Sequence, residues 1–369
     1  MKVWVLPLMP LEERYTEQWY RWFKETLERR GFDYEYIDGE RKYEYVKEGP
    51  FLDPTDSSLW TFSQIRQVIS RWNEVKEGDT FLIFDIEFPG HYEVFRFLSK
   101  LTKKGVRLVG HLHACTVTRE DFITNVPWYR HYEYAWLNTY DYITVASHYF
   151  KSRIVETLNL PPLLAQKIVV TGNPWKSSEV ADLRREWKDK NNLILYPNRF
   201  DWEKRPNIFL DIAHILRRKF PDWDIAVSTS RSHLRSNRQW LLEYLDICRK
   251  EGVIDEVYVV RKRQYYEILS RSKFIISTTI EENFGYCNIE AMTLNTIPIA
   301  PNDFAHPEVI GVKECLYDDY GEIPDRISYL DKADKNQIFA KFQERVSHYD
   351  KSIDRILDLL QPPTIKSTR

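Results

Sequence analysis

At 369 residues the chain is too long for one ordinary core, so we expect about two domains. Apolar residues make up 43% and charged residues 29%, a balance that excludes a disordered or fibrous protein. The 53 Lys and Arg nearly cancel the 55 Asp and Glu, which argues against a strong general affinity for nucleic acid.

The first half of the chain alternates short β-rich runs with amphipathic stretches, a pattern that predicts a parallel sheet covered by helices. The predicted strands are Lys2–Leu8, Phe32–Ile37, Thr80–Asp85, Val106–His111, Tyr142–Ala146 and Lys167–Thr171. The predicted helices are Tyr15–Arg30, Phe62–Val75, Tyr92–Lys103 and His148–Leu158.

The alternation breaks at the turn Gly172–Pro174 and then restarts. The predicted strands are now Asn192–Tyr196, Trp223–Ser228, Glu256–Val260, Phe274–Ser277 and Ile297–Ala300. The predicted helices are Arg205–Phe220, Gln239–Glu251, Gln264–Arg271, Phe284–Leu294 and a last helical stretch, Asp334–Leu360. We therefore predict an α/β protein with an N-terminal domain at 1–172, a C-terminal domain at 173–345, and a final helix and tail at 346–369.

Cysteine usage and the N-terminus bear on location. The four cysteines are scattered without a CxxC pair, which disfavours a disulfide framework or a zinc site and is typical of a reducing cytoplasm. The N-terminus becomes charged too soon for a signal peptide, and no stretch approaches the roughly 20 apolar residues of a membrane span. We expect a cytoplasmic protein without membrane insertion.

The most informative segment is FIISTTIEENFGYCNIEAM, from Phe274 to Met292. A buried strand is predicted to end at Ser277, followed by a polar loop and a helix that begins near Phe284. Ligands of open parallel sheets bind beyond the carboxyl ends of the strands, and the amides at a helix start favour phosphate. Glu290, two turns into the helix, can accept hydrogen bonds from vicinal hydroxyls. An ordinary solvated helix with surface glutamates is the alternative on these residues alone.

The sequence around this segment resembles a known family. ENFG at 282–285 followed by EAM at 290–292 resembles the E-x-F-G-x(4)-E-A-M signature of retaining glycosyltransferases of the GT-B fold, family 4 in particular. Supporting matches occur in the family's order: KIVVTGNP at 167–174, YPNRF at 196–200, EKRP at 203–206 and HPE at 306–308. The resemblance covers roughly residues 80–350. It implies two Rossmann-like domains facing each other across a cleft, with a C-terminal helix crossing back.

The resemblance also implies a donor, a UDP- or GDP-sugar, with no metal or further cofactor required. Arg199 and Lys204 would clamp the donor diphosphate, whose charge grows as the glycosidic bond breaks and is best met by fixed cations. Glu290 would hold the ribose, and Glu282 a hydroxyl of the donor sugar. The further donor contacts implied are Arg261, Asn283, Phe284 and Gly285. Ordinary surface solvation is the alternative for Arg199 and Lys204.

In the first domain, His113 follows a predicted strand and resembles the family's histidine that contacts the donor sugar. His111 is the competing candidate, and a structural role is the alternative for either. Two departures from the family bring the recognition of the donor and of its nucleotide base into question. The loop Pro7–Glu13 lacks a glycine pair near the phosphates, and Val259–Arg263 presents three basic residues where a glycine commonly follows the strand.

Asp85 and Glu87 follow the apolar strand Phe81–Phe84 and admit a rival interpretation. A DxD-like pair after a strand can hold a metal and a diphosphate in the other glycosyltransferase architecture, GT-A. This pair is D-x-E, lies in the first domain and has no second metal element in the sequence. We instead interpret it as an acceptor contact, with simple strand termination as an equal alternative.

The resemblance implies retention at the anomeric carbon, by front-face attack in which the donor's own phosphate oxygen takes the acceptor proton. The segment 14–23 interleaves aromatic and basic residues, including Arg14 and Arg21, a pattern that can stack bases and contact phosphates. Core packing with a solvated edge is the commoner use of such a pattern.

The N-terminal opening is also similar to phage glycosyltransferases that decorate hydroxymethylated DNA bases. We therefore keep such a base as one acceptor candidate, which would place the protein in the host cytoplasm. The alternatives are a cytoplasmic glycan, a small molecule or a lipid-linked acceptor. A nucleotide-sugar-binding scaffold without turnover is the non-enzyme alternative. Such a scaffold would require none of the four charged site residues, which are Arg199, Lys204, Glu282 and Glu290.

Overall fold

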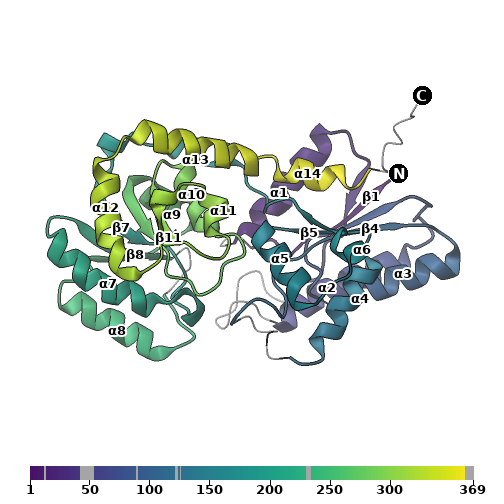
Figure 1. Ribbon diagram of the computed structural model, residues 1–369. Helices are drawn as coiled ribbons and strands as arrows, with labels where there is room; N and C mark the ends of the chain where they lie inside the picture. The colour runs from purple at the N-terminus through teal and green to yellow at the C-terminus, as the bar shows by residue number, and fades with distance from the viewer. Residues whose placement is uncertain are drawn as a thin grey trace. The chain divides into compact units, whose positions relative to one another are not determined.

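The computed structural model describes residues 1–11, 14–41, 54–88, 90–120, 124, 126–229 and 234–361. The chain forms two compact units of similar size (Figure 1). Unit 1 comprises Met1–Pro174 together with Lys351–Arg369, and unit 2 comprises Trp175–Asp350. Each contains a six-stranded parallel sheet, as the alternation of the sequence predicts.

The sheet of unit 1 has the strand order β2-β1-β3-β4-β5-β6. Its strands are β1 (Val3–Leu6), β2 (Tyr34–Tyr36), β3 (Thr80–Ile83), β4 (Arg107–His111), β5 (Tyr142–Val145) and β6 (Ile168–Val170). Its helices are α1 (Tyr15–Arg29), α2 (Pro54–Ser70), α3 (His91–Thr102), α4 (Tyr129–Thr139), α5 (His148–Thr157), α6 (Pro162–Ala165) and α14 (Ser352–Asp358).

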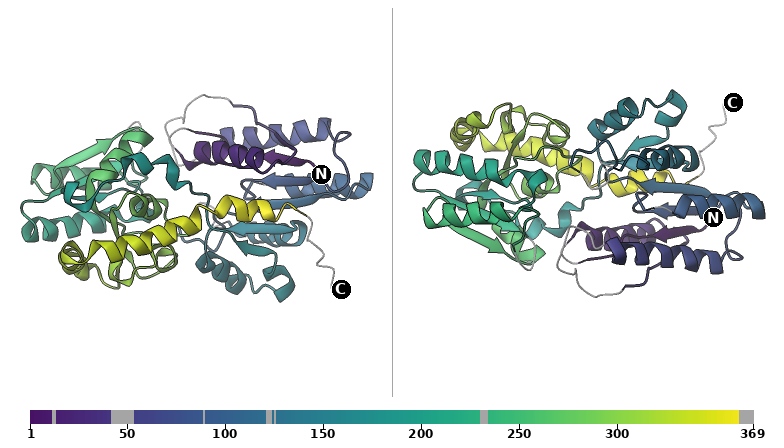
Figure 2. Two further views of the ribbon diagram at one scale, coloured as in Figure 1. Left: turned by 90° about the horizontal axis from the view of Figure 1, so that it is seen from above. Right: turned by 90° about the horizontal axis from the view of Figure 1, so that it is seen from below.

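The helices of unit 1 cover both faces of this sheet. In Figure 1, α1 and α14 lie above the strands, and α2, α3 and α4 lie below them. The views from above and below agree, with α14 in front of the strands only when seen from above (Figure 2). Arg29 and Arg30 of α1 form ion pairs with Asp354 and Asp358 of α14 at 3.1 and 2.8 Å. The end of the chain thus belongs to the same unit as its beginning.

The sheet of unit 2 has the order β12-β11-β10-β7-β8-β9. Its strands are β7 (Asn191–Tyr196), β8 (Asp224–Thr229), β9 (Glu256–Val259), β10 (Ser272–Ile276), β11 (Ile297–Pro301) and β12 (Leu316–Tyr317). Its helices are α7 (Pro206–Lys219), α8 (Gln239–Lys250), α9 (Lys262–Arg271), α10 (Tyr286–Thr293), α11 (His306–Ile310), α12 (Ile323–Lys332) and α13 (Lys335–Tyr349).

The strand order puts the helices of unit 2 on opposite faces. Because parallel crossovers are right-handed, α7 and α8 lie on one face, while α9 and α10, whose crossovers run the other way along the sheet, lie on the other. Figure 1 shows this division, with α7 and α8 below the strands and α9 and α10 above. The central strands β7, β10 and β11 are fully apolar where they pass between these layers.

The structure corrects the sequence prediction at several elements. The predicted helix Asp334–Leu360 is broken, because α13 ends at Tyr349 and α14 starts at Ser352. The Asp350 carboxylate at the break accepts hydrogen bonds from the amide and hydroxyl of Ser177 at 2.7 and 2.6 Å, which fixes the end of α13 within unit 2. The sequence analysis did not predict helices α4, α6, α11 and α12 or the short strand β12. Residues 362–369 of the predicted tail and Glu12 and Glu13 of the predicted N-terminal loop lie outside the described residues.

Candidate functional site

The predicted donor residues of unit 2 come from the carboxyl ends of neighbouring strands. In the sheet, β7 lies beside β10 and β10 lies beside β11. Residues 197–205 follow β7, residues 277–285 follow β10, and residues 302–306 follow β11. Because the strands are parallel, these three segments leave the sheet at the same edge, where open α/β sheets bind their ligands.

The loop after β7 is held against the loop after β10 by its backbone. The Thr278 hydroxyl donates to the carbonyls of Lys204 and Arg205, both at 2.9 Å, and the Tyr196 hydroxyl donates to the Lys204 carbonyl at 2.7 Å. Arg205 has a φ of 50°, a left-handed conformation that costs energy for a residue with a side chain. These hydrogen bonds and Pro206, at the first position of α7, hold the chain in that conformation. Lys204 is thereby fixed at the edge of the sheet.

Lys204 and Glu282 form a buried ion pair. The Lys204 ammonium lies 2.9 Å from Oε2 of Glu282, and the two side chains are only 16% and 17% exposed. Burial acts to lower the pKa of Lys204 and to raise the pKa of Glu282, but the charges and hydrogen bonds around each group, led by the attraction between the two, together outweigh it. The pKa of Lys204 is therefore raised and that of Glu282 lowered, so both groups are charged at neutral pH. Surface solvation, the alternative for Lys204, does not describe this residue.

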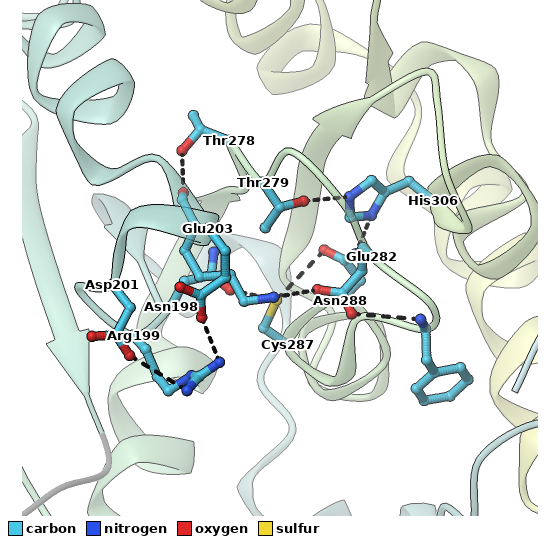
Figure 3. Close-up of polar contacts among 12 residues, drawn as sticks. Asn198, Arg199, Asp201, Glu203, Thr278, Thr279, Glu282, Cys287, Asn288 and His306 are labelled. Atoms are coloured by element: carbon cyan, nitrogen blue, oxygen red, sulfur yellow. Dashed lines mark hydrogen bonds and ion pairs between the residues drawn. The ribbon is translucent and has the colours of Figure 1, made fainter. Parts of the chain in front are cut away.

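Arg199 lies on the same loop and faces two carboxylates (Figure 3). Its guanidinium is 2.6 Å from Glu203 and 3.4 Å from Asp201. The Arg199 side chain is partly exposed, which leaves its planar fork within reach of a ligand. Arg199 and Lys204 thus both lie on the segment that follows β7.

The start of α10 depends on a glycine and a histidine. Gly285 has a φ of 81°, and a Cβ added there would lie 2.8 Å from Nδ2 of Asn288. That Nδ2 donates to Nδ1 of buried His306 at 2.9 Å, and the other ring nitrogen of His306 lies 3.1 Å from the Thr279 hydroxyl (Figure 3). Because Asn288 donates to Nδ1, Nε2 of His306 carries the proton and donates to Thr279. Burial lowers the pKa of His306 to about 4, so the ring is neutral at pH 7.

Glu290 is buried inside α10, which corrects the alternative of a solvated surface helix. It is 3% exposed, as part of a run of buried residues that extends from Asn288 to Thr293. The Lys262 ammonium and the Tyr266 hydroxyl lie 2.9 and 3.1 Å from its Oε1, and the Tyr265 hydroxyl lies 3.0 Å from its Oε2. A buried carboxylate without partners would be strongly destabilising, and these donors supply them.

The remaining predicted donor residues differ in how far they are exposed. Asn283 is partly buried in the loop after β10, and Arg261 is exposed at the start of α9. Phe284 is buried and packs edge-on against Tyr286 and Tyr349, each at 5.0 Å between ring centroids. Phe284 therefore supports the loop rather than presenting its ring to a ligand.

The sequence analysis did not single out Lys262, Tyr265 and Tyr266 as site residues. Lys262 belongs to the basic run at 261–263 that stands where the family has a glycine, and this departure was the signal that could have found it. The tyrosines follow three and four residues later, the spacing that puts side chains on one helix face.

The charges of this edge show what the arrangement can do. Each ammonium in it is paired with a carboxylate: Lys204 with Glu282 and Lys262 with Glu290. An arriving diphosphate could share the Lys204 cation, because Coulomb attraction is strong where water is largely excluded. The carboxylates would then face the hydroxyls of a ligand, which are hydrogen-bond donors.

The two candidate histidines of unit 1 pack together around Trp19. The centroid of each ring lies 5.0 Å from that of Trp19. His111 is buried, and its ring nitrogens lie 2.8 Å from the Thr144 hydroxyl and 3.0 Å from Asn173 Oδ1. His113 is more exposed, and its Nε2 donates to the Phe84 carbonyl at 2.9 Å. Burial lowers the pKa of both rings, that of His113 to about 4.

The candidate acceptor residues of unit 1 have structural partners. The Asp85 carboxylate accepts the Glu87 amide at 2.9 Å, and buried Glu87 accepts the Ala114 amide at 2.7 Å. These contacts close the ends of β3 and β4, as strand termination would require. Arg21 forms an ion pair with Glu17 on α1 at 3.1 Å, and Arg14 is the N-cap residue of that helix.

Three aromatic side chains of segment 14–23 correct the idea that they stack bases, while Tyr15 and Tyr20 are partly exposed. Trp19, Trp22 and Phe23 are buried in the core of unit 1. They cannot serve as a platform for a nucleic-acid base, and core packing is what the interleaved pattern encodes here. Arg14 and Arg21 lie beside them on the partly exposed side of α1.

Within the described ranges, no three or more His, Cys, Asp or Glu side chains gather in an arrangement that could hold a metal ion. Every helix in the same ranges is too short or too polar to span a membrane.

Comparison with known proteins identifies the domain. Residues 180–352 match the family described as glycosyl transferases group 1. The chain is also 27% identical over 126 residues to a tRNA-queuosine alpha-mannosyltransferase of Drosophila melanogaster. That match covers 34% of this chain and only 32% of the relative. The predicted family is confirmed for the matched part of the chain.

Solved structures confirm the predicted fold. A structure described as the lipopolysaccharide outer core galactosyltransferase WaaB has a TM-score of 0.65 at 16% identity, covering 98% of this chain and all of that one. One described as trehalose-6-phosphate from E. coli bound with UDP-2-fluoro glucose has the same TM-score at 13% identity, covering 97% and 98%. For TarM of S. aureus the values are 0.58 and 12%, covering 81% of this chain and 59% of that one. At these identities the likeness concerns the fold, which is GT-B.

Proposed function

We propose that this protein, whose residues 180–352 carry a group 1 glycosyl transferase domain, moves a sugar from a nucleoside-diphosphate donor to an acceptor hydroxyl with retention at the anomeric carbon. The observation that carries the proposal is the buried pair of Lys204 and Glu282, with Arg199 on the same loop. A scaffold has no use for a desolvated ion pair at the ligand-binding edge of a sheet, because such a pair contributes little to stability.

In this proposal Arg199 and Lys204 bind the donor diphosphate and stabilise the charge that develops as it leaves. Glu282, released from part of its contact with Lys204, accepts a hydrogen bond from a hydroxyl of the donor sugar. Glu290 accepts a hydrogen bond from the ribose. Asn283, the amides at Gly285 and the exposed Arg261 add further contacts to the donor. A phosphate oxygen of the donor takes the acceptor proton, since the Glu290 carboxylate is buried among hydrogen-bond donors of the protein.

His113 and the acceptor residues belong to the same proposal as contributions of unit 1. His113 is favoured over His111 because it is the more exposed of the two. Its neutral ring can exchange its present partners for a sugar hydroxyl. Asp85 is the better candidate of the D-x-E pair, since Glu87 is buried and committed to the Ala114 amide.

For the acceptor we propose a hydroxyl on a nucleic-acid nucleoside. The hydroxymethyl group of a modified DNA pyrimidine is the candidate from the sequence, and it would make this a DNA-modifying enzyme of phage origin. It projects into the major groove, where a protein can reach it. The Drosophila relative favours a second candidate, because its name gives a tRNA nucleoside as the substrate. A glycan, a small alcohol or a lipid-linked sugar is the competing outcome.

The test is a matrix of donors and acceptors read by product mass. UDP- and GDP-sugars are each incubated with hydroxymethylated DNA, queuosine-containing tRNA and a panel of glycans and alcohols. We expect one hexose mass on one nucleic acid, and NMR of the new linkage should show the anomeric configuration of the donor. Donor hydrolysis without transfer would leave only the donor half of the proposal, and no donor turnover at all would favour a scaffold.

Adding EDTA to the same assay distinguishes the GT-B architecture from the metal-dependent GT-A alternative. If the diphosphate is met by Arg199 and Lys204, activity persists in EDTA. Abolition by EDTA with rescue by Mn²⁺ or Mg²⁺ would return Asp85 and Glu87 to consideration as metal ligands.

A further inference from the structure

The environment of Glu290 is more elaborate than binding a ribose requires. Three donors from a single helix, α9, converge on this one carboxylate. Lys262 is the first residue of α9, and Tyr265 and Tyr266 follow on the face that Lys262 shares. The Lys262 ammonium also lies over both tyrosine rings, 5.5 and 5.0 Å from their centroids.

The position of Lys262 is fixed from several directions. Oε1 of Glu290 and two ring faces hold its ammonium, and it is 19% exposed. The cation–π contacts are strengthened by this burial. The helix that carries it is closed at its start by Gln264, whose side chain accepts the Arg261 amide at 3.3 Å. A lysine held in this way is a built contact and not a solvated surface charge.

The hydrogen-bond capacity of Glu290 shows what remains open. A carboxylate has about four acceptor sites, two on each oxygen. Lys262 and Tyr266 use those of Oε1, and Tyr265 uses one of Oε2. Among the described residues, Oε2 therefore keeps one open site on a side chain that is otherwise immobilised. A ligand hydroxyl bound there would displace no protein donor.

We propose that Lys262, Tyr265 and Tyr266 are positioning residues that hold the Glu290 carboxylate for a single ribose hydroxyl and so make the site select ribonucleoside over deoxyribonucleoside diphosphates. This inference rests on the proposed function, because Glu290 must face the nucleotide. Without Lys262 the carboxylate keeps two hydroxyl donors but loses its countercharge, and its oxygens can rotate away from the ligand. The basic run that replaces the family's glycine thereby acquires a role in donor choice.

The experiment measures nucleotide binding by calorimetry and needs no acceptor. UDP and GDP are each compared with their 2′-deoxy and 3′-deoxy forms on the intact protein. A hydrogen bond to a buried charged group is worth about 1.5–3 kcal/mol, so wild type should prefer one ribonucleotide roughly 10–150-fold over one deoxy form. In Lys262→Met this preference should fall about tenfold through weaker ribonucleotide binding, with deoxynucleotide affinity unchanged. Lys262→Arg should restore part of it.

The outcomes separate the inference from its premise. A Lys262→Met protein that keeps the preference overturns the inference, and so does one that loses affinity for both nucleotides equally, which would be a merely structural effect. Tyr266→Phe removes one hydroxyl from a folded protein and should reduce the preference two- to fivefold, so the test survives if Lys262→Met does not fold. Wild type that binds none of the nucleotides sinks the proposed function itself. If Glu290→Gln leaves the preference intact, the ribose contact lies elsewhere.

Discussion

The two units are built on similar six-stranded parallel sheets, yet they treat their charged residues differently. In unit 2 the charged candidate residues contact other side chains: Lys204 forms an ion pair with Glu282, and Glu290 accepts hydrogen bonds from three side chains of α9. In unit 1 the candidate carboxylates accept backbone amides near strand ends, as Glu87 does with the Ala114 amide. The side-chain pairs of unit 2 are the ligand site that we propose, whereas the carboxylates of unit 1 that accept amides at strand ends stabilise the sheet.

The histidines sharpen this contrast. Unit 1 buries His91 and His111, and burial lowers the pKa of His91 to about 4 and that of His111 well below its usual value. Unit 2 has His306 as its counterpart, also with a pKa of about 4. Unit 1 therefore depends more on neutral buried histidines, and acid should affect the two units unequally.

The largest expected effect is the loss of stability of unit 1 in acid. The unfolded chain protonates these histidines below about pH 6.5, while the folded chain resists protonation down to about pH 4. The stabilisation is therefore complete above pH 6.5 and lost as the pH falls. At pH 5 a histidine whose folded pKa is about 4 costs about 2 kcal/mol, so unit 1, with the depressed pKa values of His91, His111 and His113, should lose more stability than unit 2, where His306 is the counterpart.

Hydrogen exchange measures this difference directly. Amides of β4 in unit 1 should lose more protection between pH 7 and pH 5 than amides of β7 in unit 2, after correction for intrinsic exchange. Lys190 of unit 2 does not disturb the comparison, because burial lowers its pKa to about 7 and it is protonated in both states below that. The exposed His148→Gln variant should leave the difference unchanged. If amides of unit 2 lose protection at a higher pH than those of unit 1, the predicted role of the buried histidines is wrong.

The second prediction tests the paired charges of unit 2. Lys204→Ala should lower turnover about 10²–10³-fold, the scale for removing one donor that stabilises the leaving group. The variant also leaves Glu282 buried without its partner, at a cost of about 3–5 kcal/mol, so assays belong below its melting temperature. Steady-state kinetics of a variant shown to be folded by circular dichroism gives the answer.

A matched control for Lys204 exists on α8. Lys250 forms an ion pair with Asp246 at 2.5 Å, but its side chain is 74% exposed. Lys250→Ala should change neither turnover nor stability measurably, because exposed pairs contribute little. Near-normal turnover of folded Lys204→Ala would remove Lys204 from the mechanism and leave Arg199 as the diphosphate ligand.

The third prediction concerns the start of α10. Gly285→Ala should destabilise the protein by about 1–2 kcal/mol, because an alanine is strained at positive φ. It should also lower turnover roughly tenfold, since the new Cβ would push Asn288 away from His306 and shift the loop that carries Glu282. Thermal unfolding and kinetics on one preparation separate the two effects.

Gly252 provides the comparison for Gly285. Its φ is 71°, and a Cβ added there would meet nothing within 4 Å. Gly252→Ala should show a similar loss of stability with full activity. If both variants lose activity alike, the effect at Gly285 comes from general destabilisation and not from the site.

The sequence could predict which charged residues of unit 2 come together, because they stand in short runs that follow strands. Lys204 and Glu282 lie 78 residues apart, but each lies in the segment that follows a strand, and β7 and β10 are neighbours in the sheet. The burial of Glu290 could not be predicted, because it depends on tyrosines of α9 that come from a separate crossover. Spacing within one helix does not show what packs against it.

The same limit explains the errors elsewhere. Helix α4 is rich in aromatic residues with modest helix propensity, and tertiary burial of Trp136 and Leu137 stabilises it. The break after Tyr349 depends on a contact between Asp350 and Ser177, which are 173 residues apart. The aromatic–basic segment 14–23 has the same pattern whether its aromatics face a ligand or a core. Only the neighbours of Trp19 and Trp22 decide between these.

The smallest expected effect concerns the acceptor, where unit 1 offers surface charges instead of a paired cluster. If a nucleic acid is the acceptor, its phosphates must be met locally, because the whole chain is nearly neutral. Arg21 already forms an exposed ion pair with Glu17, so its share in binding a phosphate is modest. Replacing Arg14 and Arg21 together with Ala should raise KM for the nucleic acid about three- to tenfold at low salt, leave donor hydrolysis intact, and lessen the dependence of KM on salt by up to two phosphate contacts. Arg29, which is paired with Asp354 at the other end of α1, is the control, and Arg29→Ala should leave KM unchanged. If the double variant changes neither KM nor its salt dependence, the acceptor does not lie along the start of α1, and the charged residues of unit 1 serve its own fold.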